Sequence, residues 1–209
     1  MRDSFIKGLE KAAMNDPEIV LITGDLGFGV LNQFWETYPN QFINAGVAEQ
    51  NMTAVASGLA LEGFKTFTYS IGNFPTLRCL EQIRNDACYH NANVNIIAVG
   101  GGFSYGQLGM SHHATEDIAI MRALPNMQVL VPSTKKQASD AVKIMLDYQG
   151  PSYLRIDKGF ATINDPCHSI KLGKINIIAQ GQSVIIAVTG AILQEVLDAT
   201  VILKECGIN

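Results

Sequence analysis

Short apolar runs alternate along this chain with longer segments whose apolar residues recur at helical spacing, and this alternation constrains the fold most. Strands alternating with helices predict an α/β fold, with a mostly parallel sheet and helices on both of its faces. We predict strands over residues 20–23, 42–44, 65–71, 94–99, 127–131 and 152–156. We predict helices over residues 3–15, 31–38, 48–61, 76–89, 116–124 and 135–148.

Composition agrees with this fold class and argues against several classes of partner. Of the 209 residues 47% are hydrophobic and only 16% are charged, which is typical of a sheet buried on both faces. The formal net charge of -4 gives no reason to expect nucleic acid or an acidic membrane as a partner. Because no apolar span is long enough to cross a bilayer and residues 1–3 lead into an amphipathic helix, we expect a cytoplasmic protein. The cysteines lack metal-site spacing, so we expect no metal ligands and reduced thiols at Cys79, Cys88, Cys167 and Cys206.

The stretch from Phe42 to Met52 contains the most informative acidic residue. It reads as a short strand, a turn at Gly46, and a helix that carries Glu49 in its first turn. Glu49 is therefore expected where a strand passes into a helix, at the edge of the sheet where ligands of parallel sheets bind. An acid in the first turn also complements the helix dipole, and the residues alone leave that interpretation open.

The segment Gly46-Val47-Ala48-Glu49-Gln50-Asn51-Met52 resembles the glutamate motif of the transketolase family, in the domain that binds the aminopyrimidine ring of thiamine diphosphate. The resemblance extends over nearly the whole chain, through residues 116–127, 129–132 and 150–155. It implies that Glu49 hydrogen-bonds a ring nitrogen of thiamine diphosphate and promotes proton removal from C2 of the thiazolium, with the cofactor supplying the carbanion chemistry. It implies ketol transfer between sugar phosphates. Deoxyxylulose phosphate synthases and the beta subunits of 2-oxo acid dehydrogenases share this architecture, so those reactions remain alternatives.

Three further residues are candidate cofactor contacts because of the same resemblance. Asp25, in Gly24-Asp25-Leu26-Gly27, stands in a segment that lies near the cofactor in the family. Phe74 stands where an aromatic ring stacks on the pyrimidine, although packing in the core is an equally good interpretation. Ile71 stands where the family usually carries another aromatic residue, which puts one wall of the pocket in doubt.

The long glycine-rich loop over residues 100–114 is the candidate substrate loop, because such loops carry function more often than packing. The resemblance assigns His112 to the family histidine that contacts the sugar, as a catalytic and substrate-binding residue, and it suggests a substrate contact for His113. Leu108 stands where the family typically carries an acid that accepts a hydrogen bond from a substrate hydroxyl, so the usual ketose phosphates are not assured substrates. Two adjacent histidines without a carboxylate or cysteine at ligand spacing make a poor metal site.

Two basic residues follow or end the last predicted strand of the sheet. Arg155 and Lys158 stand where relatives carry phosphate-binding or interface cations. Arginine binds phosphate with two parallel hydrogen bonds, whereas lysine acts more as a point charge. Salt bridges to the segment that follows are an equally good interpretation.

The predicted organisation divides the chain into a pyrimidine-binding α/β domain over residues 1–159, a linker over 160–182, and a strand and helix over 183–209. The linker carries the breaker Asn164-Asp165-Pro166. Residues 183–190 read as a buried strand and residues 191–205 as a helix, which resembles the first unit of a truncated transketolase carboxyl-terminal α/β domain.

The motif that holds Mg²⁺ and the diphosphate in thiamine enzymes is not visible in the sequence. A diphosphate with Mg²⁺ needs oxygen ligands and helix N-termini. The resemblance therefore implies a partner that holds Mg²⁺, a separate amino-terminal transketolase-like subunit, beside a homodimer of this chain. A catalytically silent truncated homologue that serves as a dimerisation module is the alternative outside enzyme chemistry.

Overall fold

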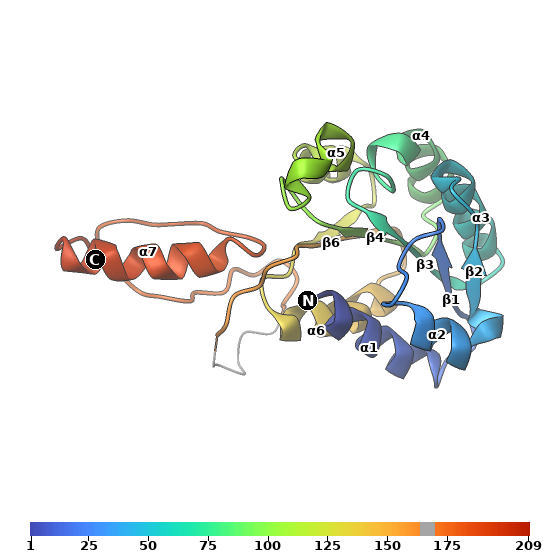
Figure 1. Cartoon of the computed structure of the whole chain (residues 1–209), viewed down its shortest axis with the longest axis horizontal. Coiled ribbons are helices and arrows are strands. Elements are labelled where there is room, and N and C mark those ends of the chain that lie inside the picture. The colour runs from blue at the N-terminus through green and yellow to red at the C-terminus, as the bar shows by residue number, and fades with distance from the viewer. Residues whose placement is uncertain (164–169) are drawn as a thin grey trace.

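The computed structural model describes residues 1–163 and 170–209. Its centre is a single six-stranded sheet with the order β2-β1-β3-β4-β6-β5, and every pair of neighbouring strands is parallel (Figure 1). The predicted parallel α/β fold is therefore confirmed. The strands are β1 (Ile19–Thr23), β2 (Phe42–Asn44), β3 (Lys65–Ile71), β4 (Val94–Val99), β5 (Gln128–Leu130) and β6 (Ser152–Ile156).

Helices cover both faces of the sheet, as the alternation of elements requires (Figure 1). One face packs against α1 (Arg2–Ala13), α2 (Asn32–Thr37) and α6 (Lys135–Asp147). The other face packs against α3 (Glu49–Leu61), α5 (Asp117–Ala123) and the helical segment between β3 and β4. Short 3-10 turns complete the fold at η1 (Pro39–Gln41), η2 (Leu77–Cys79), η4 (Gly106–Leu108) and η5 (Met110–His112).

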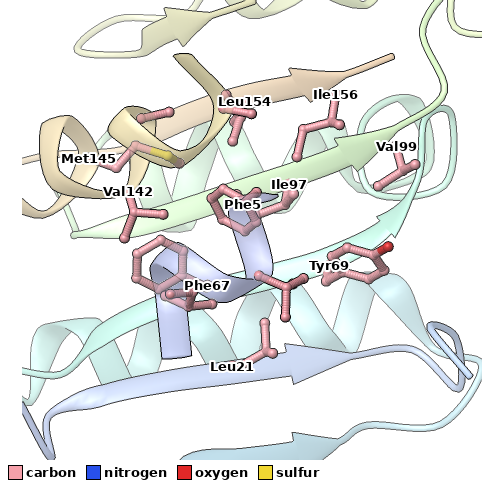
Figure 2. Close-up of a cluster of buried hydrophobic side chains, with 14 of the residues drawn as sticks. Phe5, Leu21, Phe67, Tyr69, Ile97, Val99, Val142, Met145, Leu154 and Ile156 are labelled. Carbon is pink, nitrogen blue, oxygen red and sulfur yellow. The ribbon is translucent and has the colours of Figure 1, made fainter. Parts of the chain in front are cut away.

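Two hydrophobic cores result, because successive strand residues point to opposite faces of the sheet. Phe67 and Tyr69 of β3 face the α1 and α6 side, where Phe5 packs against the middle of the sheet (Figure 2). Ile96 and Ala98 of β4 belong to the opposite core. A sheet buried on both faces is rigid, so the loops at its carboxyl edge start from fixed points.

The helix predicted over residues 76–89 is irregular. It begins as the 3-10 turn η2, continues as α4 (Leu80–Gln82), and widens into the π-helical segment η3 (Ile83–Cys88). Its first turn is held by the loop after β3, because the Thr76 hydroxyl donates to the Gly72 carbonyl at 2.8 Å. The Cys79 thiol also donates to the Phe74 carbonyl at 3.3 Å. Irregular helical geometry of this kind is frequent at functional sites.

The strand predicted over residues 183–190 is wrong. These residues form no strand, and Val184 and Ile185 are 53% and 97% exposed. A strand needs a neighbour for its ladder hydrogen bonds, and within the described part of the chain no strand lies beside this segment. The predicted helix is present as α7 (Leu193–Glu205), which lies apart from the sheet (Figure 1). The breaker at residues 164–166 lies outside the described residues, and the division into domains stays a prediction.

None of the helices in the described ranges combines the length and apolar character that crossing a bilayer would require.

Candidate active site

The predicted site residues gather at the carboxyl edge of the sheet. The order of strands places β1 between β2 and β3, so the chain leaves β1 toward one side and returns through β3 on the other. Such a switch of direction opens a crevice at the carboxyl ends of the strands, where parallel sheets bind ligands. Gly24 follows β1, Glu49 follows β2 and Phe74 follows β3.

Glu49 is a buried acid at this edge. It is the first residue of α3 and only 3% exposed. Gly46, with φ of 71°, makes the turn between β2 and α3 that delivers it. Gly24 lies against it from the end of β1. A Cβ at Gly24 would lie 3.2 Å from the Gly46 carbonyl oxygen and 3.4 Å from Cγ of Glu49, so the small residue preserves the position of the carboxylate.

Arg78 connects Glu49 to Phe74. Its Nη1 donates to Oε2 of Glu49 at 2.8 Å, and its guanidinium carbon lies 4.5 Å from the centroid of the Phe74 ring. Phe74 reaches this place through a tight turn in which its N–H donates to the Ile71 carbonyl at 2.8 Å. Ile71 itself ends β3 beside Val99 of β4. Glu49 and Phe74 thus contact the same flat cationic group.

The sequence interpretation missed Arg78. One signal was available, because a cation near the start of a helical segment opposes the helix dipole and calls for an acidic partner. Nothing local identifies that partner, since Glu49 lies 29 residues earlier in the chain.

Asp25 lies at the same edge, but its carboxylate is exposed and pairs with Asn44. The Asp25 N–H donates to Oδ1 of Asn44 at 3.0 Å, and Nδ2 of Asn44 donates back to Oδ1 of Asp25 at 3.2 Å. The same Asn44 oxygen accepts the N–H of Gly46 at 3.0 Å. Asp25 therefore shapes the turn that leads into Glu49.

The glycine-rich loop brings His112 to Phe74. A bridge between Gly102 and Ala114 closes the loop at its base. The imidazole of His112 meets the Phe74 ring edge-on, with centroids 5.0 Å apart, and its Nδ1 lies 3.0 Å from the Ser111 hydroxyl.

His113 does not join this contact. Its ring packs on Phe103 at 5.0 Å, and its Nε2 lies 3.0 Å from the Gly106 carbonyl oxygen. The structure thus separates the two adjacent histidines. Leu108, at the end of η4, is 56% exposed on the same loop.

Tyr105 links His112 to Lys158, and the sequence interpretation missed it. Its ring centroid lies 5.8 Å from that of His112, and Nζ of Lys158 stands 3.8 Å over its face. A side chain at Gly100 would overlap the Tyr105 ring, and Gly100 has a φ of 89°, so only glycine fits there. Burial raises the pKa of Tyr105 above its ordinary value. The Tyr105 ring therefore lies between Lys158 and the candidate substrate histidine, His112.

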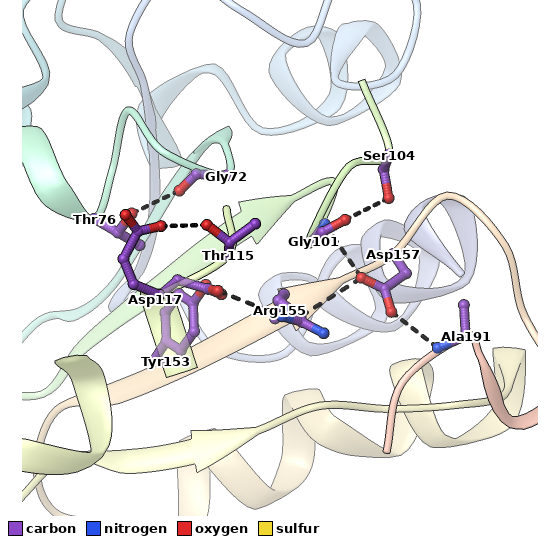
Figure 3. Close-up of polar contacts among 11 residues, drawn as sticks. Gly72, Thr76, Gly101, Ser104, Thr115, Asp117, Tyr153, Arg155, Asp157 and Ala191 are labelled. Atoms are coloured by element: carbon purple, nitrogen blue, oxygen red, sulfur yellow. Dashed lines mark hydrogen bonds and ion pairs between the residues drawn. The ribbon is translucent and has the colours of Figure 1, made fainter. Parts of the chain in front are cut away.

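Arg155 is only 14% exposed and is engaged by two carboxylates (Figure 3). Its Nη1 donates to Oδ1 of Asp117 at 3.3 Å, and its Nε lies 3.5 Å from Oδ1 of Asp157. Asp117 is 1% exposed and accepts the Tyr153 hydroxyl at 2.5 Å. Burial raises the pKa of Tyr153 well above its ordinary range.

Asp157 also accepts hydrogen bonds from two other segments. It accepts the N–H of Gly101 at 3.2 Å and that of Ala191 at 2.8 Å, which ties β6 to the glycine-rich loop and to the segment before α7 (Figure 3). The geometry thus favours the salt-bridge interpretation of Arg155, and its proposed phosphate contact stays a prediction.

The residues present fit one half of the cofactor implied by the resemblance. A buried carboxylate beside an aromatic ring suits an aminopyrimidine, which needs an in-plane hydrogen-bond partner and a flat apolar face. Among the residues that the structure describes, no group of three or more histidines, cysteines or acids could hold a metal ion.

Comparison with known proteins shows the family to which the chain belongs. Residues 1–162 match the family model "Transketolase, pyrimidine binding domain". The chain is 35% identical over its whole length to one subunit of the apulose-4-phosphate transketolase of Phocaeicola vulgatus, and it covers 68% of that subunit. It is 37% identical to the putative transketolase C-terminal section of Methanocaldococcus jannaschii, again over its whole length and 67% of that protein.

A solved structure is similar over the same extent. The structure described as "Split gene transketolase, inactive beta4 tetramer" superposes with a TM-score of 0.87 at 33% identity, over 99% of this chain and 68% of the other. The present chain thus spans about two thirds of the length of these three relatives. It belongs to the transketolase family through the pyrimidine-binding domain, whose family membership implies binding of thiamine diphosphate.

Proposed function

We propose that this chain is the pyrimidine-side subunit of a transketolase-like enzyme that transfers a two-carbon ketol unit between sugar phosphates or related sugars. The observation that carries the proposal is the buried Glu49 carboxylate at the sheet edge, facing the same group as the Phe74 ring. Relatives named as transketolase subunits support it.

In this proposal Glu49 and Phe74 hold the aminopyrimidine ring, by a hydrogen bond to a ring nitrogen and by stacking. When bound, thiamine diphosphate supplies the carbanion chemistry of ketol transfer. Glu49 promotes proton removal from C2 through its hydrogen bond to the ring nitrogen. Its burial excludes water that would compete for this hydrogen bond. Asp25 supports the site through the turn at Gly46, and Ile71 leaves one wall of the pocket without an aromatic ring.

The sugar would meet the glycine-rich loop. His112 is placed beside Phe74, so it can contact a substrate that reacts next to the pyrimidine. Lys158 is the better candidate for a phosphate contact than Arg155, because Arg155 already pairs with Asp117 and Asp157. His113 packs on Phe103 and is the more peripheral of the proposed substrate contacts.

The diphosphate and Mg²⁺ would be held by a separate amino-terminal subunit. Each active site would then form between chains, and a homodimer of this chain would bring two such edges together. The relative solved as a beta4 tetramer is described as inactive, which supports a need for a second kind of subunit.

Calorimetry on the chain alone and with an amino-terminal subunit tests this proposal. Alone, with thiamine diphosphate and Mg²⁺, we expect a dissociation constant no better than about millimolar, because few contacts must offset the entropy of fixing a flexible cofactor. With the partner we expect tight binding and ketol transfer. Micromolar binding or turnover by the chain alone would contradict the proposal.

Deoxyxylulose phosphate synthesis is the second candidate reaction. The chain is 31% identical to the 1-deoxy-D-xylulose-5-phosphate synthase of Caldanaerobacter subterraneus over 99% of its length, and it covers 33% of that enzyme. Assaying the assembled enzyme with pyruvate and glyceraldehyde phosphate, in parallel with ketose donors, separates the two reactions. A 2-oxo acid dehydrogenase beta-like role would require turnover of the 2-oxo acid without a sugar acceptor. A silent dimerisation module would fail every one of these assays.

A further inference from the structure

We propose that Arg78 occupies the pyrimidine site of this subunit by itself, and that its side chain must swing outward before an aminopyrimidine ring can enter. The inference rests on the proposed function, since it takes Glu49 and Phe74 as the contacts of that ring. It adds a gate, built from a residue of this chain, to the site.

The geometry of Arg78 imitates that of the expected ligand. A guanidinium is flat, carries N–H donors in its plane and stacks on aromatic faces. Here one N–H meets the Glu49 carboxylate at 2.8 Å while the guanidinium carbon lies 4.5 Å from the Phe74 centroid. An aminopyrimidine is also flat and needs the same two partners. The guanidinium already lies over the Phe74 ring and bonds Oε2 of Glu49, so an aminopyrimidine that stacks on that ring face and bonds that oxygen must displace it.

The burial of the two partners shows which of them can move. The Glu49 side chain is 3% exposed, whereas the Arg78 side chain is 46% exposed. The carboxylate is therefore fixed in the wall of the site, and the guanidinium approaches it from the solvent side. Arg78 stands on the short turn η2, so rotation of a long side chain clears the site without unfolding a helix.

The cost of opening explains why Arg78 would act as a gate. A buried carboxylate left without a partner is strongly unfavourable, so Glu49 keeps the guanidinium until a protonated ring nitrogen of the aminopyrimidine, which can donate a hydrogen bond, replaces it. A ligand that binds only the open arrangement has its affinity reduced by the fraction of molecules that are open. The gate therefore weakens cofactor binding to the lone chain by this factor, and the contacts that a partner subunit adds offset the loss.

Titration of the chain with the aminopyrimidine half of thiamine, as its free alcohol, tests the gate by ligand-observed NMR. Arg78→Met removes the competitor at similar side-chain length, and we expect it to bind the fragment at least about tenfold more tightly than the wild type. Arg84→Met is the matched control, because Arg84 lies exposed on the same helical segment and its guanidinium donates to the neighbouring Asn85 side chain. It should bind like the wild type.

A second variant guards against misfolding of the first. Arg78→Lys keeps a positive charge for Glu49 but lacks the flat group that covers Phe74, so we expect an intermediate gain in fragment affinity. Fragment binding by both Arg78 variants that is equal to or weaker than that of the wild type would overturn the gate.

The outcome can be separated from a failure of the proposed function. If the Arg78 variants gain nothing while proton exchange at C2 in the assembled enzyme still depends on Glu49, the gate is refuted and the proposed function stands. If that exchange does not depend on Glu49, the proposed function fails and the gate fails with it. A gain in Arg78→Met that Glu49→Gln abolishes supports both.

Discussion

His112 of the glycine-rich loop touches Phe74 edge-on, with ring centroids 5.0 Å apart. The two residues follow different strands, β3 and β4, and belong to the two halves of the proposed site. The Phe74 ring also lies against the Arg78 guanidinium that Glu49 binds. The contact with His112 therefore places the candidate substrate loop directly against Phe74, the candidate cofactor contact. Changes at loop positions other than His112, which touches Phe74, should alter substrate choice without disturbing the cofactor contacts.

Leu108 tests this expectation. It is exposed on the same loop and cannot accept a hydrogen bond from a substrate hydroxyl. A hydroxyl that loses its partner costs about 1–3 kcal/mol, so Leu108→Asp should raise the relative kcat/KM for a hydroxyl-bearing ketose phosphate about 5- to 150-fold. The measurement is kcat/KM of the assembled enzyme over a panel of ketose donors.

Gln107→Asp is the control, because it adds the same charge to the neighbouring exposed position of η4. It should leave the order of preference among donors as in the wild type. Equal effects of the two variants, or none, would mean that Leu108 does not read the substrate.

Arg155 should act on stability rather than on phosphate affinity. Arg155→Met leaves the carboxylates of Asp117 and Asp157 without their cation, and removal of one partner from a buried ion pair costs about 3–5 kcal/mol. Urea unfolding should show a loss of free energy of unfolding of that order. Lys158→Met removes only an exposed cation over Tyr105 and should cost less than about 1 kcal/mol. Comparable small losses in both variants would argue that Arg155 is free to bind phosphate.

The buried thiols predict a loss of stability in alkali. Burial raises the pKa of Cys88 from 9.0 to about 11. The unfolded chain therefore releases this proton at lower pH than the folded chain, so the contribution to stability is complete below pH 9 and is lost as pH rises toward 11. Burial raises the pKa of Cys79 to about 11 as well.

Urea unfolding in reducing buffer between these pH values measures the effect. Cys88→Ala should show a smaller fall in the free energy of unfolding than the wild type, although it starts from a lower value because a buried side chain is truncated. Cys206→Ala changes an exposed thiol and should follow the wild-type curve. If the free energy of unfolding of Cys88→Ala fell with pH as steeply as that of the wild type, the raised pKa of Cys88 would not be the cause of the loss.

The fold was largely predictable because its signals are local. The helix predicted over residues 48–61 is observed at Glu49–Leu61, since the turn at Gly46 and the spacing of Met52 and Ala56 mark its start and its buried face. The apolar run at residues 183–190 looked equally strand-like. It is not a strand, because a strand depends on a neighbour that sequence periodicity cannot supply.

The site was predictable only in part, because contacts between residues far apart in the sequence leave no local signal. The motif resemblance directs attention to Glu49 and His112, whereas Arg78, Tyr105 and Asp117 gain their positions from tertiary contacts. Arg155 and Asp117 are 38 residues apart, and no spacing rule pairs them. The resemblance suggested a phosphate contact for Arg155, but the pair of carboxylates around it becomes visible only in the folded chain.

The most direct test of the central claim is hydrogen–deuterium exchange at C2 of thiamine diphosphate bound to the assembled enzyme, in wild type and in Glu49→Gln. The substitution keeps the size of the side chain and removes the carboxylate to which we assign the proton transfer, so circular dichroism should show an intact fold. The account predicts that exchange in Glu49→Gln is abolished, or slowed by at least about a hundredfold, the lower end of what a general acid or base contributes. Exchange at the wild-type rate in Glu49→Gln would contradict it.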